Sequence, residues 1–152
     1  MIINELGQRR TSWAAFGLSA IGLCPGCSDG RPERVPVAGR VVIDGRPLEQ
    51  GNVRVHPPGD RAATGKLGPN GQFTLSTYEL GDGCVVGNHP VSINAMEVVN
   101  STTLRWHTPK EYRESATSGL SIDVTEPTND LEIQLTWNGG KPFTERVAGG
   151  GD

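Results

Sequence analysis

The sequence predicts an all-β fold in which two sheets pack face to face as a β-sandwich. Apolar and polar residues alternate in six or seven short segments at a spacing of roughly ten residues, as in strands with one buried face. The 21 glycines and 11 prolines stand between these segments, so they mark turns. After the first 26 residues, no segment has an equally clear apolar stripe of helical period.

Each predicted strand is defined by apolar residues at every second position. Because alternate side chains of a strand point to the same face, each set should cover one side of a sheet. A second sheet must then cover that side. The sets along the chain are Val35, Val37, Val41 and Ile43, then Val53 and Val55, then Phe73 and Leu75, then Val91, Ile93 and Ala95, then Leu120, Ile122 and Val124, and finally Leu131, Ile133, Leu135 and Trp137.

Two short turns are predicted between these strands. Asp44 and Gly45 both tolerate positive φ, which a two-residue hairpin connection requires, so they should join the first two strands. Pro69-Asn70-Gly71 combines a fixed φ with a reversal signal, and we expect a second hairpin there. It should join the strand ending at Leu67 to the strand that contains Phe73.

The beginning of the chain has the layout of an export signal. Arg9 and Arg10 precede an apolar stretch over 13–23, which is about half the length of a membrane-spanning helix, and Cys27 follows a small residue. We predict a lipoprotein-type signal peptide over 1–26, lipidation of Cys27 and a linker over 27–34. The protein should then be anchored by lipid to a membrane of the cell envelope. The alternative is an ordinary secretory leader that releases a secreted or periplasmic soluble protein.

Charge and cysteine content limit the partners and the chemistry. The net charge is −3 and the basic residues are scattered, so the sequence excludes a nucleic-acid-binding role. Of the three cysteines, Cys24 would leave with the leader and Cys27 would be acylated. Cys84 is then expected to be a free, buried, apolar residue, although a Cys27–Cys84 disulfide is possible if Cys27 is not acylated.

Several stretches of the mature chain form a recognisable pattern. They are Val37-Ala-Gly-Arg-Val-Val-Ile-Asp-Gly-Arg-Pro-Leu48, Gly51-Asn-Val-Arg-Val-His-Pro57, Pro69-Asn-Gly-Gln-Phe-Thr-Leu-Ser-Thr-Tyr78, Gly81-Asp-Gly83, Tyr112, Ser118-Gly-Leu120 and Asn129-Asp-Leu131. This pattern resembles small planctomycete-type envelope lipoproteins with a carboxypeptidase-regulatory-like, transthyretin-like domain. The resemblance covers about Val35 to Leu135. It implies a seven-stranded prealbumin-like sandwich without known catalytic residues.

Two regions depart from the pattern of that family. Pro90 lacks the N–H group of a ladder donor, so the strand around it should start late or lie at a sheet edge. The tail over 138–152 is rich in glycine and extends past the usual end of the family, so we predict that it is disordered. The sandwich domain itself should span 35–137.

Catalytic and metal-binding patterns are weak. The three histidines His56, His89 and His107 have no paired spacing, so no metal or cofactor is expected. Asp82 between two glycines could serve calcium, but a turn in which its carboxylate accepts local backbone N–H groups explains it more simply. Tyr112-Arg-Glu-Ser115 is superficially similar to the ending of transthyretin-like ureide hydrolases. We therefore predict a non-enzymatic protein, with a small transthyretin-like hydrolase as the alternative.

The expected role is structural or in binding, with a protein or a glycan of the envelope as partner. The long connections 79–88 and 97–118 should form the working surface, because long loops cost more ordering entropy than linking requires. The candidate residues there are Trp106, His107 and Tyr112. Tyr78 and Trp137 are further aromatic candidates, and the two short hairpins are not expected to take part. The alternative is that Trp106 and Tyr112 seal one end of the sandwich core.

Overall fold

The computed structural model describes residues 30–148 of the chain. The predicted signal peptide, Cys27 and the end of the tail over 149–152 lie outside the described residues. The fold belongs to the compact unit Pro32–Asp152, which is distinct from the unit Met1–Arg31. Within residues 30–148, no helix has the length and apolar character needed to cross a membrane.

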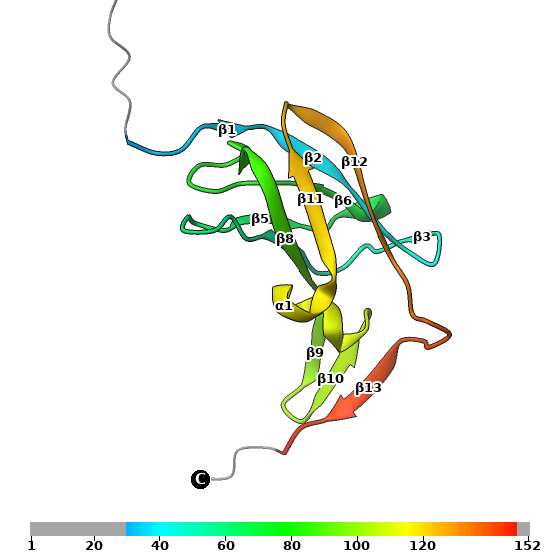
Figure 1. Cartoon of the computed structure of the whole chain (residues 1–152). Helices are drawn as coiled ribbons and strands as arrows, with labels where there is room; N and C mark the ends of the chain where they lie inside the picture. Colours follow the sequence, from blue (N-terminus) through cyan, green and yellow to red (C-terminus); the bar gives the residue numbers. More distant parts are fainter. Residues whose placement is uncertain (1–29, 149–152) are drawn as a thin grey trace, which may run out of the picture. The chain divides into compact units, whose positions relative to one another are not determined.

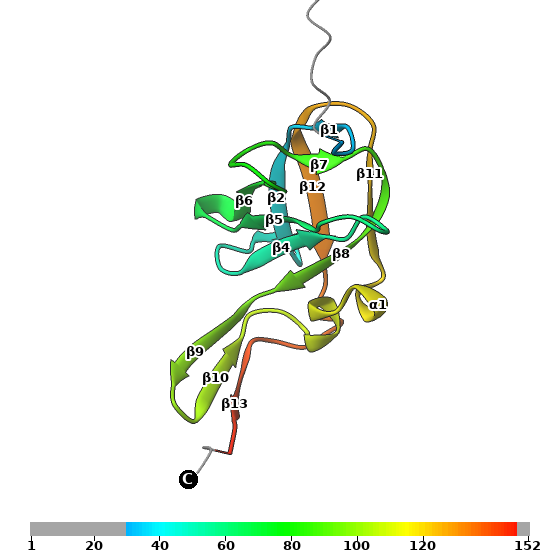
Figure 2. The same ribbon diagram turned by 90° about the vertical axis from the view of Figure 1, so that its left-hand side faces the viewer.

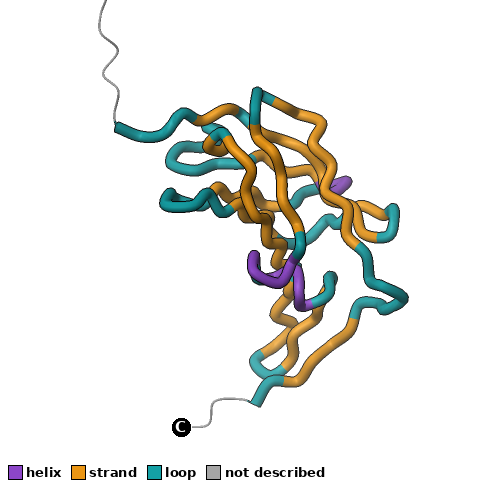
Figure 3. The backbone as a smooth tube through the Cα atoms, in the orientation of Figure 1, coloured by secondary structure: helices purple, strands orange, loops and turns teal. Residues whose placement is uncertain are grey.

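The fold is all-β, as predicted (Figure 1), and helix is confined to short turns, as the tube in Figure 3 shows. The strands are β1 Arg34–Val35, β2 Val37–Ile43, β3 Arg46–Pro47, β4 Asn52–Val55, β5 Ala63–Lys66, β6 Gln72–Thr74, β7 Cys84–Val85, β8 Gly87–Asn94, β9 Met96–Asn100, β10 Thr103–Trp106, β11 Leu120–Val124, β12 Thr128–Leu135 and β13 Phe143–Arg146. The helical turns are the 3-10 turns η1 Pro69–Gly71 and η2 Lys110–Arg113, and the one-turn helix α1 Ser115–Ser118.

Two sheets enclose the core in a sandwich-like arrangement. One has the strand order β12-β2-β3 with β6 paired to β2, and the other has the order β11-β8-β4-β5. β12 and β2 run parallel, whereas the other pairs in these sheets are antiparallel. Two smaller sheets complete the unit: β1 pairs with β7, and β9, β10 and β13 form a three-stranded sheet. Figure 2 shows β9 continuing from the end of β8.

The predicted alternation describes the core correctly. Val41, Val53, Val55, Val91 and Ile93 have no exposed surface, and every apolar residue of the predicted sets belongs to the core cluster or packs against it. The members that remain partly exposed are Val35, Leu120, Leu131 and Trp137. The period of two in the sequence therefore identifies the buried face of each main strand.

The first predicted hairpin is confirmed. Asp44 and Gly45 have φ values of 47° and 77°, and they connect β2 to β3. The second turn joins β5 to β6 as predicted, but the two arms bridge only at Thr64↔Ser76, and β6 forms its ladder with β2. Gly71 explains this crossing: a Cβ there would lie 2.4 Å from the carbonyl oxygen of Val41, so only glycine lets the chain pass this close to the other sheet.

The prediction for the strand around Pro90 is wrong. β8 spans Gly87–Asn94 and lies centrally, between β11 and β4. The carbonyl of Pro90 accepts the N–H of His56 at 2.9 Å, one residue beyond the end of β4. In an antiparallel sheet, the N–H and the carbonyl of one residue point toward the same adjacent strand. The N–H that Pro90 lacks would therefore have pointed toward the end of β4. The proline thus costs one bond at the end of that ladder.

The long connection predicted over 97–118 and the described part of the tail predicted to be disordered, 138–148, both contain strands. β9 and β10 lie largely within the first segment, and β13 lies in the second. β10 pairs with β13 on one side, from Thr103↔Arg146 to Trp106↔Phe143, and with β9 on the other side. Val98 and Val99 in β9 are exposed, so this sheet lacks the alternation that reveals a strand in the sequence.

Candidate functional site

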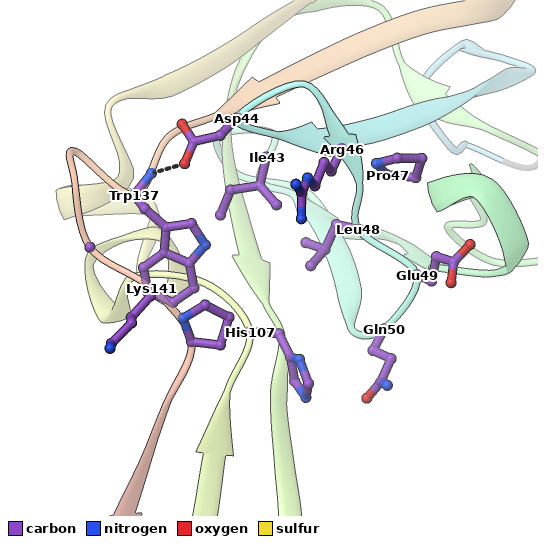
Figure 4. A pocket seen from close by; sticks show the side chains of 12 residues that line it. Ile43, Asp44, Arg46, Pro47, Leu48, Glu49, Gln50, His107, Trp137 and Lys141 are labelled. Carbon is purple, nitrogen blue, oxygen red and sulfur yellow. Dashed lines mark hydrogen bonds between the residues drawn. The ribbon is translucent and has the colours of Figure 1, made fainter.

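An open groove of about 540 Å³ lies beside the β2–β3 hairpin. The segment that follows β12 forms its other wall (Figure 4). Its lining combines one indole ring, aliphatic side chains and charged groups. The lining residues are Ile43, Asp44, Arg46, Pro47, Leu48, Glu49, Gln50, His107, Trp137, Gly140, Lys141 and Pro142.

Hydrogen bonds fix Trp137 at the wall of this groove. The backbone N–H of Trp137 donates to Oδ2 of Asp44 at 3.2 Å, drawn as a dashed line in Figure 4. The N–H of Asp44 donates in turn to the carbonyl of Leu135 at 3.0 Å. Gly140 turns the chain back with an N–H bond to the Trp137 carbonyl at 2.9 Å, and Phe143 meets the indole edge-on with ring centres 6.5 Å apart. The ring is thus preorganised.

The groove offers an apolar surface with a polar rim. Ile43 and Leu48 are buried, and Figure 4 shows them between Trp137 on one side and Gln50 on the other. The carboxylates of Asp44 and Glu49 match the cations of Arg46 and Lys141 in number, so the charges cancel. An aromatic face beside dispersed donors and acceptors suits an uncharged polar ligand that has one apolar face.

Trp106 is buried, with 3% of its surface exposed. Its indole N–H donates to Oε2 of Glu145 at 3.0 Å, and the ring stacks on Phe143 at 6.3 Å. Nζ of Lys110 lies 5.2 Å from the centre of the same ring. The indole therefore joins β10 to β13 and does not line the groove.

Tyr112 is also buried, and its hydroxyl closes the end of the core. It accepts the N–H of Thr136 at 3.2 Å and donates to the carbonyl of the same residue at 3.3 Å. Tyr112 belongs to the core cluster and fits the sealing alternative, whereas Trp106 is buried outside that cluster, in the three-stranded sheet. Of the three predicted surface residues, only His107 lines the groove, where its Nε2 lies 3.1 Å from Oε2 of Glu97.

The other predicted candidates lie elsewhere. Tyr78 is half-buried, and its hydroxyl donates to Oδ1 of Asp60 at 2.9 Å. His89 is buried with Nε2 2.8 Å from the carbonyl of Val85, and His56 lies on the second sheet. Within residues 30–148, no three His, Cys, Asp or Glu side chains gather as a metal site would require.

Asp82 and Cys84 have the environments predicted for them. The carboxylate of Asp82 accepts the N–H groups of Thr77 at 2.6 Å and Tyr78 at 3.1 Å, which confirms the local turn. Burial opposes ionisation of Asp82, but these bonds and Arg34 outweigh it and lower its pKa. Cys84 is a free thiol with no exposed surface, and burial raises its pKa to about 11.

Sequence reasoning missed most of the groove. Two of its residues, Arg46 and Leu48, come from the hairpin region, which turn geometry alone seemed to explain. Lys141 comes from the tail for which disorder is predicted. The parallel pairing of β12 with β2 brings them together, from Thr128↔Val37 to Leu135↔Ile43. No local pattern reports such a long-range pairing. Two signals were available: Trp137 at the end of the last alternating set, and His107 in the long connection.

Comparison of the chain with protein-family models, curated proteins and solved structures finds no match. Function is therefore inferred from the residues and their geometry.

Proposed function

We propose that this chain is a non-enzymatic lipoprotein of the cell envelope, exported and then anchored to a membrane by lipid on Cys27. Its β domain is a prealbumin-like sandwich of the carboxypeptidase-regulatory-like kind, with four strands in each facing sheet and the three-stranded sheet as an addition. The two facing sheets and the leader sequence support this proposal. The domain acts as a binding module for a neutral saccharide of the envelope.

The position of Trp137 at the groove is the observation on which the binding role depends. The face of an indole ring has partial negative charge, so the C–H groups of a sugar ring are attracted to it. The rim of Asp44, Glu49, Arg46 and Lys141 offers both acceptors and donors to sugar hydroxyls, and its charges cancel. A strongly charged ligand would gain from only half of this rim.

Calorimetric titration of the full-length protein with tetramers of N-acetylglucosamine and of glucose tests the binding role. We expect at least one tetramer to bind with a Kd of about 10 μM to 1 mM. Trp137→Ala should abolish that binding, whereas Trp137→Phe should retain part of it because a ring remains. Trp106→Phe is the matched control and should bind like the wild type, because Trp106 lies outside the groove. Failure of both tetramers to bind would contradict the saccharide proposal, and crosslinking in intact envelopes would then show whether a protein occupies the groove.

Fractionation of cells that produce Cys27→Ala tests the anchor separately. A lipid anchor contributes about 0.8 kcal/mol per buried methylene, so its loss should move the protein from the membrane to the soluble fraction. Unchanged membrane retention would contradict lipidation of Cys27.

The hydrolase alternative has one supporting observation. Nε2 of His56 lies 2.9 Å from Oγ of Ser92 in a cavity that Arg113, Glu114 and Ser115 also line. A serine nucleophile also needs a group that orients its base. Among residues 30–148, no carboxylate forms a hydrogen bond to His56. A serine-directed fluorophosphonate should therefore leave Ser92 unmodified, and an adduct on Ser92 would favour the hydrolase.

A further inference from the structure

A second cavity, of about 510 Å³, lies on the outer face of the sheet β11-β8-β4-β5. Its wall is completed by the segment where η2 ends and α1 begins, which lies against β8 as Figure 1 shows. In contrast to the Trp137 groove, its lining has no large apolar side chain. The lining residues are Asn52, Arg54, His56, Thr64, Ser92, Asn94, Arg113, Glu114 and Ser115.

The floor of this cavity is a polar pair of buried Ser92 and half-buried His56. Ser92 stands opposite Arg54 in the β4–β8 ladder and would face solvent in a bare sheet, but it is only 6% exposed. Its Oγ lies 2.9 Å from Nε2 of His56. Burial is the largest cause that lowers the pKa of His56, and the charge of Arg54 is the next; the charge of Glu114 acts in the opposite direction. The imidazole is therefore neutral at neutral pH. Its ring nitrogen and the serine hydroxyl give the cavity a polar floor.

The charged groups around this floor leave an excess of positive charge. Arg54 projects from β4, and no carboxylate of the described residues lies within ion-pair distance of it. Arg113 and Glu114 are 51% and 71% exposed and only 3.8 Å apart at their nearest atoms, so each can turn toward a ligand. Two guanidinium groups against one carboxylate favour an oxyanion, since planar guanidinium forks match its geometry.

The side chain of Asn94 contributes an acceptor that lacks a hydrogen-bond donor. Oδ1 of Asn94 is buried and has no hydrogen-bond partner in the structure. An unpaired buried acceptor is costly, and a ligand hydroxyl would satisfy it once the amide of Asn94 rotates its oxygen toward the cavity that the residue lines. We propose that this cavity binds a small organic anion that has a carboxylate or phosphate group next to hydroxyl groups. Arg54 binds the anionic group, and Asn94 accepts a hydrogen bond from a hydroxyl.

NMR titration of the full-length protein with glycerol 3-phosphate, glycerate and propyl phosphate tests this site. The first two probes separate phosphate from carboxylate as the anionic group, and propyl phosphate has the charge without the hydroxyls. The signals of the His56 imidazole report binding directly, because the negative charge of a bound anion favours the protonated ring and so offsets the effect of Arg54. We expect saturable shifts with glycerol 3-phosphate or glycerate, and binding of propyl phosphate about tenfold weaker than of glycerol 3-phosphate if phosphate is the preferred group.

Three variants locate the site. Arg54→Gln should weaken binding at least about tenfold, since it removes a charge-assisted bond. Lys66→Gln is the matched control: it removes one positive charge from the same sheet, outside the cavity lining, and should leave the affinity unchanged. Trp137→Ala should also bind normally, which separates this site from the saccharide groove. No saturable shift with either hydroxylated probe, or equal losses in Arg54→Gln and Lys66→Gln, would overturn the proposal.

Discussion

The carboxylate of Asp44 accepts a hydrogen bond from the backbone N–H of Trp137, although the two residues are 93 positions apart in the chain. Asp44 occupies the first of the two positive-φ positions of the β2–β3 turn, and Trp137 follows the end of β12. The bond therefore ties the turn of one strand pair to the aromatic wall of the groove. The groove is thus formed by the same contacts that close this end of the sandwich.

The first prediction concerns Asp44. Asp44→Ala should lower the free energy of unfolding by about 1–2 kcal/mol, because it removes a hydrogen bond and places alanine at φ 47°. Asp44→Gly keeps the turn geometry and should lose only about 1 kcal/mol. Urea unfolding measures both. Equal stability of Asp44→Ala and the wild type would mean that the Asp44–Trp137 bond is not made in solution.

The second prediction concerns Trp106. Trp106→Ala should cost about 3–5 kcal/mol of unfolding free energy, as expected for a buried aromatic side chain. Trp106→Phe should cost less, because a ring can still stack on Phe143 while the bond to Glu145 is lost. Thermal and urea unfolding provide the values. A change of less than about 0.5 kcal/mol in Trp106→Ala would argue that the indole is exposed in solution.

The third prediction concerns the thiol of Cys84. With a pKa of about 11, only about one thiol in a thousand is ionised at about pH 8, and burial also blocks access. Iodoacetamide should modify the Cys84 peptide very slowly in the folded protein and rapidly after unfolding in guanidinium. Mass spectrometry of the digested protein distinguishes the two. Equal labelling rates in both states would contradict a buried thiol.

The fourth prediction is a pH dependence that originates at Asp82. Its pKa is lowered from 3.8 in the folded state, so the carboxylate stabilises the fold at pH values above 3.8. That contribution is lost as the pH falls below 3.8 and through the folded-state pKa. Asp82→Asn should lower the melting temperature at about pH 7 and show a smaller further drop between about pH 4 and about pH 2 than the wild type. Parallel pH profiles of the two proteins would show that Asp82 is not the group responsible.

The core could be predicted from the sequence because it depends on a local rule. Alternation from Val37 to Ile43 or from Val91 to Ala95 reports directly which side chains are buried, and the φ preferences of Asp44 and Gly45 report the first turn. The three-stranded sheet has no such signal. β9 exposes Val98 and Val99, and β13 exposes Phe143, so neither strand shows a single buried face.

The candidate site was harder to predict because pairing rather than pattern forms it. The parallel register of β12 against β2 brings Trp137 to Asp44, and this register cannot be predicted from the sequence of either strand alone. Likewise, Ser92 looks like a solvent-facing strand residue until η2 and α1 cover it. Side chains such as Lys141 had no period or motif to distinguish them from linker residues.

NMR titration with the N-acetylglucosamine tetramer tests the central claim most directly, because the protein contains its own control. The indole N–H of Trp137 lies at the groove, whereas that of Trp106 is bonded to Glu145 and buried. We predict that the tetramer shifts the Trp137 indole signal in a saturable manner and leaves the Trp106 indole signal in place. Shifts of the Trp106 signal alone, or no shift of the Trp137 signal at saturating tetramer, would contradict a saccharide-binding groove at Trp137.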